Sequence, residues 1–217
     1  MESTRQEIKD LVDALLRVDR LGAEELVVRA LEQGKSFNTV DQLIVPALEE
    51  IGRGWETGAV ALAQVYMSSK VCEELMKRFL PGTVTPQGEY PRIAIALLED
   101  YHALGKMIIS TALRAEGYSL KDYGRLTVEE LVQKVCEDSI KVILISTLML
   151  RSALRVKQVK QLLEQAGSSV KIIVGGAPYR FDPLLWQEVG ADAMGANAAE
   201  AIEAVAACLE KTEKMVE

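Results

Sequence analysis

From Arg92 onward, short apolar runs alternate with amphipathic stretches, a pattern that few folds can accommodate. Strands are predicted at 93–98, 119–123, 142–146, 170–174 and 192–194. Helices are predicted at about 106–116, 153–166 and 182–189, with one more opened by the capping box Thr127 to Glu130 and a last one from Asn197. Five strand and helix alternations favour a parallel sheet covered on both faces. With right-handed crossovers, the predicted fold is α/β: a flavodoxin-like (Rossmann-type) doubly wound five-stranded parallel sheet of order 2-1-3-4-5.

The first 80 residues have a different texture, with apolar positions at helical spacing and no convincing strand. They predict an N-terminal four-helix bundle, whose third helix runs from about Thr39 to Trp55 and whose fourth follows Gly58. Pro46 should kink the third helix or mark its true first turn. Three prolines and two glycines between Pro81 and Pro91 are typical of a linker. The expected domains are a helical bundle (1–80), a linker (81–91) and a sheet domain (92–217).

The charge of the chain limits its partners. There are 25 basic and 32 acidic residues, a formal net charge of −7, which argues against nucleic acid or an anionic membrane as the main partner. No apolar run approaches the roughly 18 residues that a membrane helix needs. The first residues lack the basic and apolar regions of a signal peptide, so we expect a cytoplasmic protein. Acidic clusters near Glu24, Glu49 and Glu129 are interpreted as solvated helix faces.

Cysteine and histidine contents exclude several kinds of site. Cys72, Cys136 and Cys208 are widely separated and odd in number, so they predict neither a disulfide framework nor a zinc site. We expect them to be ordinary buried thiols. His102 is the single histidine, which excludes any metal site that needs several imidazoles.

In a doubly wound sheet the ligand lies beyond the carboxyl ends of the strands, where the strand order reverses. The loop after the first strand runs from Glu99 to Lys106, and the loop after the third begins at Ser146. Ser146 stands where a receiver domain needs an aspartate, and the two carboxylates of Glu99 and Asp100 do not suit a flavin phosphate. Neither a Walker loop nor a dinucleotide fingerprint is present. The anion-binding uses of the fold are therefore poorly supported.

The first loop instead places a carboxylate two residues before the single imidazole. Asp100 can accept the Nδ1 proton of His102 and direct the Nε2 lone pair outward, as the carboxylate partner of a metal-ligating histidine does. One protein ligand is too few to hold a metal ion alone. The metal would have to arrive inside a macrocycle.

The pattern Asp100-x-His102-x-x-Gly105, with Ser146-x-Leu148 and Gly175-Gly176, resembles the cobalamin-binding signature of methionine synthase and of the corrinoid proteins of methyltransferase systems. The four preceding helices resemble the cap domain of those proteins. The resemblance implies cobalamin bound base-off, with His102 as the lower ligand of cobalt, Asp100 hydrogen-bonded to it and Ser152 as a relay hydroxyl. It implies a cofactor-binding set of Asp100, Tyr101, His102, Leu104, Gly105, Ser146, Leu148, Leu150, Ser152, Gly175, Gly176, Asn197 and Ala198.

Several of these positions carry a more specific expectation. Ser146 would face the nucleotide tail of the cofactor, and the glycines would allow the backbone to approach that tail. Asn197 and Ala198 would border the corrin edge. Leu150 stands where many members have threonine, which removes one hydrogen bond to the cofactor. The simpler alternatives are helix caps at Ser146 and Ser152 and an ordinary strand-to-loop turn at Gly175-Gly176.

The resemblance also implies a function. The protein would be a methyl carrier rather than a stand-alone catalyst, loaded by a substrate-specific corrinoid methyltransferase and unloaded by a second methyltransferase, with a reductive activation protein as a further partner. The alternative is the small cobalamin-binding subunit of an adenosylcobalamin-dependent mutase, although such subunits generally lack a helical cap. A cobalamin-sensing regulator and a flavodoxin-like module without corrin are further possibilities. On the cap, Trp55, Tyr66 and Met67 could shield the upper corrin face, but Tyr66, Met67 and Cys72 at helical spacing favour bundle core.

Overall fold

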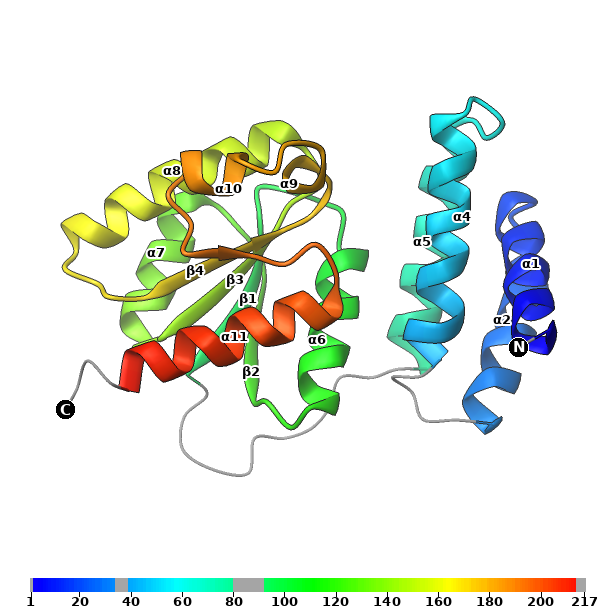
Figure 1. The fold of residues 1–217 in the computed structure, drawn as a ribbon, viewed down its shortest axis with the longest axis horizontal. Helices are drawn as coiled ribbons and strands as arrows, with labels where there is room; N and C mark the ends of the chain where they lie inside the picture. Colours follow the sequence, from blue (N-terminus) through cyan, green and yellow to red (C-terminus); the bar gives the residue numbers. More distant parts are fainter. Residues whose placement is uncertain (1, 34–38, 80–91, 214–217) are drawn as a thin grey trace. The chain divides into compact units, whose positions relative to one another are not determined.

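The computed structural model describes residues 2–33, 39–79 and 92–213, and it divides the chain into two compact units, Met1–Pro81 and Gly82–Glu217. The predicted linker, 81–91, lies outside the described residues. Each unit has its own core. The predicted combination of a helical N-terminal part and a five-stranded parallel sheet is confirmed (Figure 1).

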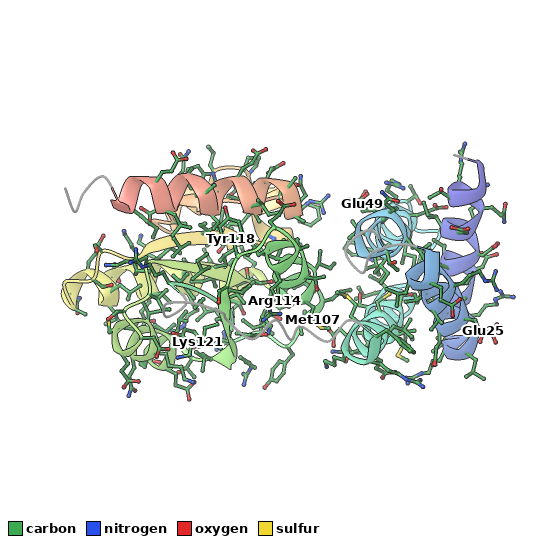
Figure 2. All side chains as sticks on the ribbon, turned by 90° about the horizontal axis from the view of Figure 1, so that it is seen from below. Glu25, Glu49, Met107, Arg114, Tyr118 and Lys121 are labelled. Atoms are coloured by element: carbon green, nitrogen blue, oxygen red, sulfur yellow. The ribbon has the colours of Figure 1, made fainter. Side chains whose placement is uncertain are left out.

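The N-terminal unit is built from helices α1 (Glu2–Leu16), α2 (Arg20–Gln33), α4 (Val45–Glu56) and α5 (Leu62–Phe79), as predicted. A short π-helical segment, η1 (Val40–Ile44), leads into α4. Pro46 lies in the first turn of α4, where its missing N–H costs no helical hydrogen bond, so it marks the true start of that helix. Figure 2 shows the side chains of Glu25 on α2 and Glu49 on α4, and both residues are exposed. Glu24 itself is partly buried and accepts from Arg78 at 2.7 Å, so only part of that acidic cluster is a solvated face. The core of this unit includes Leu11, Leu15, Val27, Ile51 and Met76.

The second unit contains the sheet, with order β2-β1-β3-β4-β5 and all neighbouring strands parallel. The predicted order is therefore confirmed. The strands are β1 (Ile93–Leu98), β2 (Leu120–Leu126), β3 (Val142–Ser146), β4 (Lys171–Gly175) and β5 (Ala193–Met194). The β2 strand extends three residues beyond its predicted end. It lies at the edge of the sheet, and only Leu120, Tyr123 and Leu126 are buried, so its sequence lacks the continuous apolar run of a central strand.

Alternate residues of the central strands pack against helices on opposite faces of the sheet. Ala94, Ala96 and Leu98 belong to a cluster with residues of α7 (Val128–Glu137) and α8 (Leu150–Gln165). Ile93 and Ile95 belong to a second cluster with residues of α6 (Leu104–Ala115) and α11 (Ala198–Glu213). Figure 1 shows the two helix layers with the sheet between them. The double covering explains why β1 and β3 are almost entirely apolar.

One sequence-based expectation about this unit was wrong, and one helix was not predicted. The short helix predicted near 182–189 is α10 (Leu185–Glu188), and a further short helix, α9 (Ala177–Phe181), precedes it. Pro178 fits the first turn of α9, so the residues after Gly176 continue into a helix rather than a loop. Cys136 is exposed, whereas Cys72 and Cys208 are buried as expected. The reason is that α7 turns Val128, Leu131 and Val135 toward the sheet and Cys136 away from it.

Candidate functional site

The carboxyl ends of β1 and β3, which are neighbours in the sheet, bring two loops together. The β1 loop carries residues 99–103, and α6 starts at Leu104 immediately after it. Ser146 ends β3 and faces the first turn of α6, since a Cβ built on Gly105 would lie 3.5 Å from the Ser146 hydroxyl oxygen. The switch point predicted from the strand order therefore lies here.

Asp100 connects the two loops through four hydrogen bonds. Its Oδ2 accepts from the backbone N–H groups of Leu148 at 2.7 Å and Met149 at 3.0 Å. Its Oδ1 accepts from the backbone N–H of His102 at 3.1 Å and lies 2.7 Å from His102 Nδ1. The carboxylate is only 1% exposed and lies at the N-terminal end of α8, where the helix dipole favours negative charge.

Opposing effects set the protonation of Asp100. Burial alone would raise the pKa of this carboxyl, but hydrogen bonds from Met149 N–H, the His102 ring and Leu148 N–H outweigh burial and lower the pKa. The group is therefore ionised at neutral pH and acts only as an acceptor. It follows that a neutral His102 carries its proton on Nδ1, directed at Asp100.

His102 is thereby oriented as a metal ligand would be. Its side chain is 31% exposed, and the carboxylate contact of 2.7 Å holds the ring through Nδ1. With the proton on Nδ1, the lone pair of a neutral ring lies on Nε2. A carboxylate partner of this kind fixes the ring and raises the basicity of the other nitrogen, the atom that can bond to a metal.

Exposed apolar side chains lie on both loops that carry this site. Tyr101 is 71% exposed, and the guanidinium of Arg125 lies 4.0 Å from its ring centroid. Leu148, Met149 and Leu150 are exposed at the start of α8. Large apolar groups at a rim that also holds an oriented imidazole suit a flat, largely apolar ligand.

The two predicted serines, Ser146 and Ser152, have different structural roles. Ser152 is buried, and its hydroxyl donates to the Glu99 carbonyl oxygen at 3.2 Å. In the described part of the chain no hydrogen bond joins Ser152 to Asp100, so the structure does not contain the relay contact that the resemblance implied. Neither serine caps α8, because Met149 occupies the cap position and Ser146 ends β3.

The structure explains the glycines at the end of β4, Gly175 and Gly176, in a way that the sequence did not indicate. Gly176 has φ of +122°, and a Cβ there would lie 1.7 Å from the Thr147 carbonyl oxygen. A Cβ on Gly175 would lie 3.0 Å from the Gly195 carbonyl oxygen. Gly176 is therefore required by the protein's own backbone, and Gly175 is in a tight position where a side chain would press on the Gly195 carbonyl oxygen. At Gly105, by contrast, the protein itself leaves room for a methyl group.

Asn197 and Ala198 lie after β5, where α11 begins. The Asn197 carboxamide oxygen accepts from Glu200 N–H at 3.0 Å, and its amide donates to the Glu200 carboxylate at 2.8 Å. Asn197 thus acts as the cap of α11 in this structure.

Three further residues contribute to the site without having been predicted. Glu99 has φ of +49°, which is rare for a residue with a side chain, and Arg155 donates to its carboxylate at 3.2 Å. Gly195 packs against α11, where a Cβ would approach the Ala201 Cα to 2.9 Å. A glycine at the end of a weak strand before a helix was an available signal for Gly195. Backbone conformation at Glu99 left no signal in the sequence.

The donor set fits a metal that brings most of its own ligands. Among residues 2–33, 39–79 and 92–213, no three His, Cys, Asp or Glu side chains gather closely enough to hold a metal ion. One oriented imidazole beside an apolar rim suits a metal enclosed in a macrocycle. None of the helices in the described ranges is long and apolar enough to cross a membrane.

Comparisons with known proteins identify the family of the chain. A B12 binding domain family matches residues 92–206, and a second B12 binding domain family matches residues 7–79. Monomethylamine corrinoid protein 1 of Methanosarcina acetivorans is 33% identical over 208 residues, covering 90% of this chain and 94% of that protein. The trimethylamine corrinoid protein of Methanosarcina barkeri is 28% identical over 223 residues, covering 96% of this chain and 99% of the relative.

A solved structure of a related protein has the same fold. The monomethylamine corrinoid protein of Methanosarcina barkeri has a TM-score of 0.77 and 26% identity, covering 93% of this chain and 97% of that one. These relatives favour the carrier prediction over the mutase alternative, and they confirm cobalamin as the cofactor. The chain therefore belongs to the corrinoid methyl-carrier proteins with B12-binding domains.

Proposed function

We propose that this chain holds cobalamin with the lower base displaced and His102 as the axial ligand of cobalt, and carries a methyl group from one methyltransferase to another. The observation that carries the proposal is the 2.7 Å contact between His102 Nδ1 and the buried Asp100 carboxylate. With Nδ1 bonded to Asp100, the lone pair on Nε2 points away from that carboxylate and can bind a metal. The cobalt of the bound cofactor would supply the atom that accepts and releases the methyl group.

Each remaining residue of the predicted set has a proposed role toward the cofactor. Apolar contacts to the corrin would come from the exposed Tyr101, Leu148 and Leu150, with Leu104 beside them at the start of α6. Ser146 and Gly105 would line the path of the nucleotide tail, since they face each other and a Cβ at 105 meets nothing closer than 3.5 Å. Gly175 and Gly176 would form the neighbouring wall. Asn197 and Ala198 would border the corrin edge.

Asp100 would set the strength of the axial ligand. It stays ionised because Leu148 N–H and Met149 N–H hold one oxygen while the other faces His102. A carboxylate that accepts the Nδ1 proton would make Nε2 a better donor to the metal. Off the metal, Nε2 could take up a proton from solvent while Asp100 keeps the Nδ1 proton, so protonation of Nε2 would compete with ligation.

The partners follow from the carrier role. A substrate-specific methyltransferase would load the protein and a second methyltransferase would unload it, and a reductive activation protein would restore the reduced cofactor. The names of the relatives point to methylamines as the first donors to assay. We expect the carrier in the cytoplasm.

Methyl transfer with a labelled donor tests this function. The full chain, loaded with cobalamin and reduced, is incubated with isotopically labelled monomethylamine, a monomethylamine methyltransferase and a second methyltransferase with a thiol acceptor. We expect label in the thiol only when this chain is present, and a marked loss with His102→Ala. A Cys136→Ala variant is the matched control, since that exposed thiol lies on α7. The proposal fails if no donor among mono-, di- and trimethylamine, methanol and betaine gives labelled thiol.

A further inference from the structure

Glu99 has an unusual backbone conformation next to the predicted ligand pair. Its φ of +49° lies in the left-handed region, which residues with a side chain rarely adopt. Strain of this kind persists only where surrounding contacts hold it, and it gathers at functional sites. Glu99 immediately precedes Asp100, so the direction of the chain at Glu99 decides where the Asp100 carboxylate points.

Three contacts hold Glu99 in this conformation. Its backbone N–H donates to Leu126 O at 2.9 Å, which ties the end of β1 to β2. Its carbonyl oxygen accepts from the Ser152 hydroxyl at 3.2 Å. Its carboxylate oxygen Oε1 accepts from Arg155 Nη2 at 3.2 Å. Every polar group of the residue that can direct the turn is therefore engaged.

Ser152 and Arg155 belong to one face of α8, because residues three apart on a helix are neighbours. The start of the same helix also supplies the N–H groups of Leu148 and Met149 that bind Asp100. Helix α8 thus holds two consecutive residues by different means: side chains fix Glu99, and backbone donors fix Asp100. Both sets of contacts are made with residue 99 in the left-handed conformation.

We propose that Glu99, Ser152 and Arg155 are positioning residues for the axial ligand. They hold the left-handed turn that aims Asp100 at His102 Nδ1, and through it they set the tautomer of the ring. The inference rests on the proposed role of His102. Ser152 acts here through the Glu99 carbonyl oxygen and not through a direct contact with Asp100. The positioning is a property of the protein before any cofactor binds.

The single histidine makes the test direct. In the full-length, ¹⁵N-labelled apoprotein, the only imidazole signals belong to His102. The two ring nitrogens are told apart by their couplings to the ring protons, and their ¹⁵N shifts then report the ratio of the Nδ1–H and Nε2–H tautomers. We expect wild type to hold mainly the Nδ1–H tautomer. Arg155→Gln, which removes the charge from a half-exposed pair, should lower the ratio of Nδ1–H to Nε2–H by about two- to fivefold. Ser152→Ala should act in the same direction.

Controls separate positioning from a general loss of structure. Arg151→Gln removes the same charge from an exposed position of the same helix and should leave the tautomer ratio unchanged. Arg155→Lys keeps the charge and should restore most of the wild-type ratio. Urea denaturation of each variant verifies that it is folded under the NMR conditions. Tautomer ratios equal to wild type in folded Arg155→Gln and Ser152→Ala would overturn the inference.

A separate measurement, binding of hydroxocobalamin by wild type, tests the proposed function. If wild type binds hydroxocobalamin but keeps the cofactor's own base on cobalt, the axial role of His102 is wrong. The tautomer ratios of the apoprotein would still decide whether Glu99, Ser152 and Arg155 orient the dyad. The two results therefore cannot be confused.

Discussion

Replacing Asp100 with asparagine measures what one buried carboxylate contributes to the site. The carboxylate accepts four hydrogen bonds, two on each oxygen. An asparagine oxygen can still accept from Leu148 and Met149, but its NH₂ group then faces the backbone N–H of His102. Two bonds to a charged acceptor are lost. At the lower end of the usual range for such bonds, the loss is about 3 kcal/mol of unfolding free energy.

The assay is urea denaturation at several pH values, with thermal denaturation as a check. At pH 7 the loss corresponds to a decrease in Tm of roughly 10 °C for a domain of this size. Hydrogen bonds lower the pKa of Asp100 in the folded protein, although burial opposes them, so its contribution is present above the unfolded pKa of about 3.9. The contribution is lost as the pH falls through the lower, folded pKa. The gap between wild type and Asp100→Asn should therefore stay constant from about pH 7 to pH 5 and shrink below about pH 4.

Glu116→Gln is the matched control, because it neutralises an exposed carboxyl group in the same unit. It should change the unfolding free energy by less than about 0.5 kcal/mol. The reasoning is refuted if Asp100→Asn is as stable as wild type at pH 7. It is also refuted if the penalty grows as the pH falls, since the sign would then be opposite to that of a lowered carboxyl pKa.

Three further predictions concern other parts of the second unit and the thiols. Gly176→Ala should lose more than about 3 kcal/mol of unfolding free energy in urea denaturation, because its Cβ would strike the Thr147 carbonyl oxygen. Gly105→Ala should fold normally in the same assay and bind cobalamin more weakly in an absorbance titration. Thr127→Ala should lose about 1 kcal/mol in urea denaturation by removing the capping box of α7, and an unchanged midpoint would contradict the observed cap. A thiol reagent should label Cys136 in the native protein and all three cysteines only in denaturant, since Cys72 is buried and burial raises its pKa to about 12. Rapid labelling of Cys72 in the native state would contradict its burial.

The central part of the fold could be predicted because its strands are apolar throughout. Runs such as 93–98 and 142–146 are buried on both faces, so composition alone identifies them. The end of β2 could not be predicted, because an edge strand with polar residues resembles a loop in sequence. Helix α9 was not predicted, because a five-residue helix after Gly176 depends on how those residues pack, which is a tertiary effect.

The site, like the fold, could be predicted from the sequence only in part. The spacing of Asp100 and His102 predicted their contact, because residues two apart in a tight loop can share a hydrogen bond. The backbone donors from Leu148 and Met149 carry no side-chain signature, so they could not be found in the sequence. The left-handed conformation of Glu99 was equally hidden. Sequence reasoning named a cofactor-related cause for Gly176, and the structure gives a backbone one.

Electron paramagnetic resonance of the Co(II) state tests the central claim most directly. Protein labelled uniformly with ¹⁵N is loaded with unlabelled hydroxocobalamin and reduced by one electron. If His102 is the axial ligand, the nitrogen splitting is a doublet in labelled protein and a triplet in unlabelled protein, and His102→Ala loses the doublet. A triplet in the labelled protein would come from the cofactor's own base and would contradict ligation by His102.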